Sequence, residues 1–184
     1  MTRLHLVAAC SVLAYGQMAA GDAPPAGNAQ AGTSLLASAT NQPPAPPAPG
    51  PTLDAALEAA GAAVKACHAI DQAVGVTIVD SAGIPKVVIA SDGASARGVQ
   101  SSTNKALTAL TFKVATSELA ERVKTDTHLQ EQIDGNAAYN IRAGGLLLLK
   151  GSSVLGAIGV GGAKGSEKDE QCARAALVKL QASK

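Results

Sequence analysis

Residues 23–51 separate two parts of the chain that differ sharply in composition. This stretch holds no charged side chain and all but one of the nine prolines. Such a sequence buries too little apolar surface to offset the entropy of ordering, and it favours extended polyproline II conformations. We therefore expect a Pro/Ala-rich disordered linker over residues 22–51 and one folded domain over residues 52–184. A docking motif for a proline-binding partner is the alternative interpretation of the linker.

The segment before the linker has the pattern of an export signal. Arg3 supplies a positive charge, the mostly apolar residues 4–13 follow, and small residues suited to cleavage come next. The apolar stretch is too short to span a bilayer, which takes about 20 residues. Residues 7–10 also resemble a lipoprotein cleavage box, and a buried N-terminal helix is a further alternative. We expect residues 1–21 to be a signal peptide and the protein to be periplasmic or secreted.

Charge and motifs weigh against two classes of function. The chain carries 15 basic and 14 acidic side chains, a balance unsuited to neutralising phosphates, so we expect no nucleic-acid partner. The hydrolase motif Gly-x-Ser-x-Gly and the zinc motif His-Glu-x-x-His are absent from the sequence, so enzymatic catalysis has little support. Aromatic residues make up 2% of the chain, and the core has to be packed from aliphatic side chains.

The residues after the linker predict helices that alternate with β-hairpins. Apolar side chains recur every three or four residues from Leu53 to Cys67, as in an amphipathic helix capped by Thr52. Strands are predicted over 74–80, 84–90, 143–149 and 154–160, and tight turns over 80–83 and 150–153. Further helices are predicted over 95–113, 117–124, 126–133 and from 166 onward. Hairpins indicate an α+β fold, an antiparallel sheet of four to five strands with helices packed on it.

A glycine-rich run, residues 156–165, lies between the last predicted strand and the last helix. Its backbone amides, the helix N-terminus and Lys164 favour an anion such as a carboxylate or phosphate beside Gly161 and Gly162. The dinucleotide fingerprint does not fit, because Lys164 stands where its third glycine would be, and the P-loop order is absent. The alternative is that these glycines permit a turn and close packing. Both interpretations stay open.

Several short motifs occur together in one order. They are residues 76–80 with Gly83, residues 92–94, Lys105 and Ala106 with Thr108 and Ala109, Thr116, Gly144 and Gly145, residues 156–163, and Asp169. In order and spacing they resemble the GlcG/HbpS family, which is related to the C-terminal domain of PduO-type proteins, over about residues 53–182. Two positions depart from the family pattern. Ser91 stands where many members carry an Arg-Met pair, and Leu146 replaces a frequent proline.

The resemblance implies a profilin-like architecture, a homo-oligomer and, as in several members, haem or a corrinoid as ligand. Some exported members act as accessory sensors beside a membrane kinase. We therefore expect an extracytoplasmic module that binds haem or a related tetrapyrrole, coupled to redox or iron sensing with a membrane sensor partner. Two alternatives stay open: an enzyme or cofactor-handling protein that acts on a small anionic carboxylate, and a ligand-free structural oligomer.

Candidate haem ligands are few. The domain holds two histidines, His68 and His128, and neither has a Cys or His neighbour at the spacing of a zinc site. Either is a candidate axial ligand for haem iron, and Tyr139 is a further one. His68 interacting with a helix dipole is the alternative for that residue. Both methionines of the chain lie in its first 20 residues, so a processed form has no methionine ligand.

Lys105, Thr108 and Thr116 are the other candidate binding residues. Lys105 and Thr108 lie three residues apart on one helix face, where we expect them to meet a carboxylate or propionate. The alternative is that Lys105 satisfies Asp92 or a strand-end carbonyl. Thr116 matches a family position that lines the ligand pocket, with a helix N-cap as its alternative role. We expect one pocket face to hold Thr116, Lys105 and one histidine.

Two cysteines remain once the signal peptide and its Cys10 are removed. Cys67 continues the apolar stripe of the first helix, and Cys172 lies on the apolar face of the last. An even number of cysteines in an oxidising compartment favours a disulfide. We therefore predict a Cys67–Cys172 bridge, with two buried free thiols as the alternative.

Overall fold

The structure is a computed structural model that describes residues 47–182. The predicted signal peptide, Cys10 and most of the predicted linker lie outside the described residues. Those linker residues that are described lie against the domain, because the Ser81 N–H donates a 2.9 Å hydrogen bond to the Pro49 carbonyl. Within the range 47–182, no helix is both long and apolar enough to cross a membrane.

Five helices and four strands form the described domain. In chain order they are α1 (Leu53–His68), β1 (Gly75–Asp80), β2 (Pro85–Ala90), α2 (Ala96–Phe112), α3 (Thr116–Val123), α4 (Thr127–Asp134), β3 (Gly145–Lys150), β4 (Ser153–Gly161) and α5 (Ser166–Ala182). Every predicted element is present, with its ends shifted by one or two residues. The α+β fold class with four antiparallel strands is confirmed.

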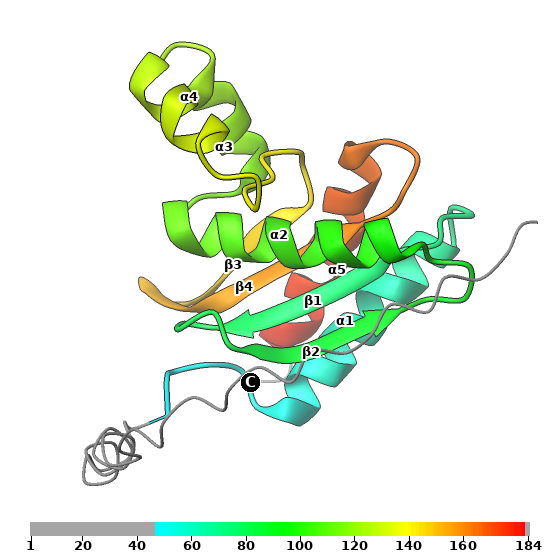
Figure 1. The fold of residues 1–184 in the computed structure, drawn as a ribbon. Coiled ribbons are helices and arrows are strands. Elements are labelled where there is room, and N and C mark those ends of the chain that lie inside the picture. Colours follow the sequence, from blue (N-terminus) through cyan, green and yellow to red (C-terminus); the bar gives the residue numbers. More distant parts are fainter. Residues whose placement is uncertain (1–46, 183–184) are drawn as a thin grey trace, which may run out of the picture. The chain divides into compact units, whose positions relative to one another are not determined.

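The sheet joins two hairpins through their inner strands. The strand order is β2-β1-β4-β3, and all neighbours are antiparallel. β1 pairs with β4 from Gly75 opposite Gly161 to Asp80 opposite Gly156. Figure 1 shows α2 crossing one face of this sheet, with α1 and α5 on the other face and α3 and α4 beyond one end of α2. The three layers place the two inner strands under helices on both sides.

The α1/α5 face is the main apolar core. Alternate residues of β1 and β4 point to it, and alanines of the two helices pack against them. Its fully buried members include Val76, Ile78, Ile158, Val160, Ala59, Ala63, Ala173 and Ala176. Cys67 and Cys172 lie in the same core and form the predicted disulfide, with their Cα atoms 5.4 Å apart. The bridge is confirmed, and it joins the end of α1 to the first half of α5.

The α2 face combines a small apolar cluster, which includes Val79 and Leu110, with glycines that lie directly under the helix. A Cβ atom on Gly159 would collide with the carbonyl oxygen of Ser102, and one on Gly161 would lie 2.7 Å from the carbonyl oxygen of Gly98. The missing side chains let the backbone of α2 approach the sheet closely. Of the two interpretations of the glycine-rich run, the close-packing one therefore describes Gly159 and Gly161.

Candidate functional site

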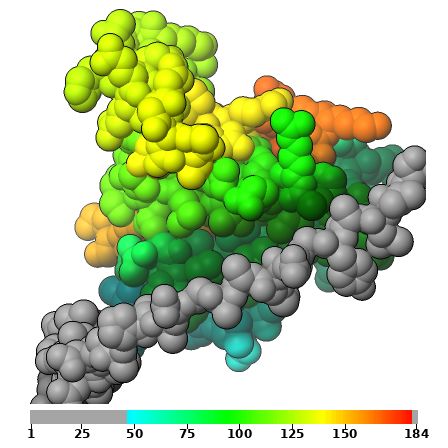
Figure 2. Space-filling view, in the orientation of Figure 1, coloured from blue at the N-terminus to red at the C-terminus, as the bar shows by residue number. Residues whose placement is uncertain are grey.

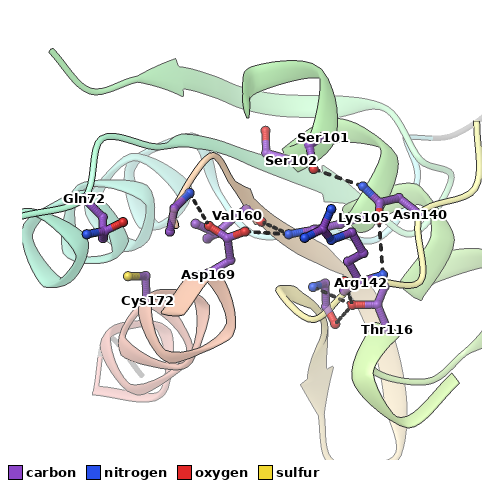
Figure 3. A network of polar contacts seen from close by, with 12 residues as sticks. Gln72, Ser101, Ser102, Lys105, Thr116, Asn140, Arg142, Val160, Asp169 and Cys172 are labelled. Carbon is purple, nitrogen blue, oxygen red and sulfur yellow. Dashed lines mark hydrogen bonds and ion pairs between the residues drawn. The ribbon is translucent and has the colours of Figure 1, made fainter. Parts of the chain in front are cut away.

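Lys105 of α2 and Asp169 of α5 form a buried ion pair beside the end of β4. The Lys105 side chain is 2% exposed, and its Nζ lies 2.7 Å from Asp169 Oδ2. The same ammonium donates to the Val160 carbonyl at 3.0 Å, and Asp169 Oδ1 accepts from the Ala163 N–H (Figure 3). Lys105 thus satisfies a strand-end carbonyl, as one of our alternatives predicted. Its acidic partner is Asp169, and the prediction of Asp92 is wrong.

Burial opposes the charges of this pair. Desolvation lowers the pKa of Lys105 and raises the pKa of Asp169, while their mutual hydrogen bond acts in the opposite direction on each. The positive charge of Arg142 lowers the pKa of Lys105 further. A buried pair of this kind contributes little net stability but is costly to break, because removal of one partner leaves the other charge buried alone. The pair therefore fixes the position of α5 relative to α2.

A polar cleft of about 650 Å³ opens beside the ion pair. Its walls are the first half of α2, the segment that contains Ala137, Asn140 and Arg142, and the start of α5. Figure 2 shows that segment, in yellow, lying against α2, in green. The charged side chains that line the cleft are Arg97, Lys105, Arg142 and Asp169. Three cations face one carboxylate, so the cleft favours an anion.

Two of these cations form no close ion pair. Arg97 and Arg142 are exposed, and neither forms an ion pair with a carboxylate of residues 47–182. Figure 3 shows the Arg142 guanidinium beside the Lys105 side chain, with Asp169 on the other side of the ammonium. Sequence reasoning missed both arginines, because nothing in their local pattern distinguishes them from ordinary surface residues.

The predicted threonines hold the wall of the cleft instead of reaching into it. Thr108 Oγ1 accepts from the Asn140 N–H at 2.9 Å, and Asn140 Nδ2 donates to Ser101 Oγ at 3.0 Å. Thr116 Oγ1 donates to the Arg142 carbonyl at 2.8 Å and accepts from the Gly145 N–H at 2.9 Å. Both hydroxyls therefore tie the segment that carries Asn140 and Arg142 to the body of the domain.

The N-cap role proposed for Thr116 is wrong. The N-cap of α3 is Ala115, no side chain caps this helix, and Thr116 is fully buried. Asp169, in the first turn of α5, is the partner of Lys105. Of the glycine pair, Gly162 lines the cleft and Gly161 packs under α2. Lys164 does not line it, and its N–H donates to Gln72 Oε1 at 2.7 Å.

A second hollow, of about 570 Å³, lies at the end of α1 and contains His68. Its lining residues are Val64, His68, Asp71, Gln72, Ala73, Ala90, Ser91 and Asp92. The His68 side chain is exposed, and its ring nitrogens make no hydrogen bond or ion pair within the described range. No group of three or more His, Cys, Asp or Glu side chains placed to hold a metal ion occurs between residues 47 and 182. His68 is thus a free imidazole in a hollow.

The structure separates the histidines from the other predicted site residues. His68 does not line the cleft at Lys105, and His128 is exposed on α4 and lines neither hollow. Tyr139 packs edge-on against Phe112, with ring centroids 5.0 Å apart. The structure therefore does not place Thr116, Lys105 and a histidine together on one pocket face.

Several solved structures of other proteins share this fold. HbpS from Streptomyces reticuli, solved as a double mutant, is 32% identical and superposes with a TM-score of 0.65 over 84% of this chain and 97% of its own. Protein ORFY from Klebsiella pneumoniae is 30% identical, with a TM-score of 0.68 over 77% and 97%. The PduOC–haem complex, at 24% identity, shares the fold with a TM-score of 0.65 over 71% and 94%.

No curated protein sequence matches the chain. A family model described as "Haem degrading protein HbpS-like" matches residues 52–178, nearly the whole described domain. The match covers α1 and all four strands, and it includes both His68 and the Lys105–Asp169 pair. The chain therefore belongs to the HbpS-like family.

Proposed function

We propose that the protein binds haem or a related tetrapyrrole in the His68 hollow. The observation that carries this proposal is the uncommitted imidazole of His68 in a hollow of about 570 Å³. A neutral imidazole is a common axial ligand of haem iron, and no other typical ligand side chain lines this hollow. Bound haem would supply an iron centre whose reactivity depends on that ligand and on the polarity around it.

The lining of the hollow fits a macrocycle that leaves its propionates outside. Val64, Ala73 and Ala90 offer small aliphatic surfaces against which a flat ring can pack. Asp71 and Asp92 repel carboxylates, so the propionates would point to solvent. The cleft at Lys105 fits haem less well, because no histidine, cysteine, methionine or tyrosine lines it.

The family supports a haem-related ligand. The matching family model is described as haem degrading, HbpS itself is a structural neighbour, and a PduOC domain of the same fold has been solved with haem. The His68 hollow is open to one side, so a second copy of the chain would cover the exposed face of the macrocycle. We accordingly propose a homo-oligomer whose subunits meet near this hollow.

The proposal includes the cellular compartment in which the protein acts. The signal-like residues 1–21 and the buried disulfide both favour an extracytoplasmic module, and a membrane sensor kinase would read its haem or redox state. Intact-mass measurement of protein recovered from the periplasm or medium should give an N-terminus between Gln17 and Pro24. A full-length product found in the cytoplasm would contradict this part of the proposal.

Haemin titration followed at the Soret band tests the ligand and its site together. The variant His68→Ala should bind haemin at least about tenfold more weakly than the parent, because the iron loses its axial ligand. His128→Ala is the matched control, an exposed histidine that lines neither hollow, and it should bind like the parent. Equal affinity of both variants would reject the site, and no Soret shift in the parent would reject haem as ligand.

A further inference from the structure

The cleft beside Lys105 differs in chemistry from the His68 hollow. Its lining holds no aromatic residue and no aliphatic side chain larger than alanine. Amide and hydroxyl groups of Gln100, Ser101, Asn104 and Asn140 alternate there with the cations. Such a lining offers nothing for a flat ring to pack against, but it offers many hydrogen-bond donors. A small polar anion fits this cleft better than a tetrapyrrole or a nucleobase.

The cations of the cleft have unused hydrogen-bonding capacity. A lysine ammonium has three donors, and Lys105 uses two of them for Val160 and Asp169. The remaining N–H belongs to a side chain that is 2% exposed and lines the cleft. The Arg142 guanidinium lies beside it without a carboxylate of its own (Figure 3). Asp169 is the one carboxylate in the lining beside these two cations, and Glu167 acts on Lys105 through its charge as well.

Arg97 adds a third cation on the α2 side of the same cleft. An arginine fork binds a carboxylate through two parallel hydrogen bonds, and such charge-assisted bonds are among the stronger polar contacts. Two unpaired forks in one cleft of about 650 Å³ suit two carboxylate groups of one small molecule. We propose that this cleft binds a small dicarboxylate, with one carboxylate at Arg142 and Lys105 and the other at Arg97.

Asn140 and Thr108 preorganise the site. The segment that carries Arg142 is held by the Asn140 bonds to Thr108 and Ser101 and by the Thr116 bond to the Arg142 carbonyl. The Arg142 backbone is therefore fixed before a ligand arrives, while its side chain stays exposed. The cost of ordering the binding segment is already met in the free protein.

Calorimetric titration of the full chain with succinate and malonate tests this inference. Acetate, inorganic phosphate and sodium chloride at equal ionic strength are the comparison probes. Arg142→Gln should weaken succinate binding at least about tenfold, because a charge-assisted fork is lost. Arg97→Gln should weaken succinate binding but leave the weaker acetate binding at Arg142 unchanged. Arg122→Gln is the matched control, since Arg122 pairs with Glu118 on α3 and does not line the cleft.

Three outcomes would overturn the inference. Equal weakening by Arg122→Gln would show a general charge effect, and equal binding of phosphate or chloride would show an unspecific anion site. Absence of succinate binding to the parent protein would remove the site altogether. The variant His68→Ala should keep full succinate affinity, so failure of the haem proposal and failure of this one are separately visible.

Discussion

The two faces of the sheet are built in opposite ways. Behind it, α1 and α5 pack alanines onto branched side chains of β1 and β4, and a disulfide joins the two helices. In front of it, α2 lies on glycines, meets the sheet through polar groups such as Thr77 and Lys105, and shares only a smaller apolar cluster with it. The apolar face gains free energy from burial, which is proportional to the area removed from water. On the α2 face, hydrogen bonds hold the polar side chains in fixed positions.

This difference accounts for where the cleft lies. On the α1/α5 face, alanines and branched aliphatic side chains pack closely between the helices and the sheet. On the α2 face, the buried ion pair brings charge to the end of β4, and the flanking cations stay open to solvent. The domain thus separates the part that holds it together from the part that recognises an anion.

The largest expected effect comes from filling the space between α2 and the sheet. In the variant Gly159→Val, the new side chain meets the Ser102 carbonyl at a distance no real Cβ adopts, so α2 has to move. Overpacking usually costs about 1–3 kcal/mol, and a backbone collision under a whole helix exceeds that range. We expect the folded state to be lost, as seen by circular dichroism and proteolysis.

Gly61→Ala is the control for that variant. Gly61 lies in α1 and has no atom within 4 Å of a Cβ built on it. Alanine in a helix interior is roughly 0.5–1 kcal/mol more favourable than glycine, so this variant should be slightly more stable than the parent. A folded Gly159→Val protein with an unchanged urea midpoint would show that α2 does not pack closely on the sheet.

The second largest expected effect comes from removing the disulfide of the apolar face. The bridge spans a sequence separation of 105, for which the chain-entropy model gives about 4–5 kcal/mol as an upper figure. The double variant Cys67→Ala/Cys172→Ala should lower the free energy of unfolding by about 2–4 kcal/mol in urea titration. Hydrogen exchange should rise more in α1 and α5 than in α2. An equal rise in the exchange of all three helices would contradict the view that the disulfide stabilises mainly the α1/α5 face.

The fold was predictable because its signals are local. The turns at Asp80–Gly83 and at Lys150–Ser153 bring β1 next to β2 and β3 next to β4, and apolar periodicity marks the helices. The disulfide was predictable for the same reason, since each cysteine lies on the apolar stripe of its own helix. The turns and the apolar stripes depend on residues within a few positions of one another, and the bridge joins two such stripes that are 105 positions apart.

The cleft was only partly predictable because its contacts are distant in sequence. Lys105 was recognised, but its partner Asp169 is 64 residues away in the sequence. Thr116 was expected to line the pocket, with a helix cap as the alternative, yet its hydroxyl donates to the Arg142 carbonyl 26 residues away. Arg142 itself has no local signal, since only the folded loop brings it beside Lys105.

The smallest expected effect comes from two substitutions at neighbouring positions of β1. Thr77 faces α2, where its hydroxyl bonds Ser102 at 2.8 Å and Thr103 at 3.0 Å, and Val76 is buried in the α1/α5 core. Thr77→Val should cost about 1 kcal/mol, because Ser102 keeps its bond to the Val99 carbonyl. Val76→Thr should cost about 1–3 kcal/mol, because it buries a hydroxyl among aliphatic groups with no polar partner. Urea titration of both variants measures the difference, and equal costs would mean that the two faces do not differ in the environment they offer a hydroxyl.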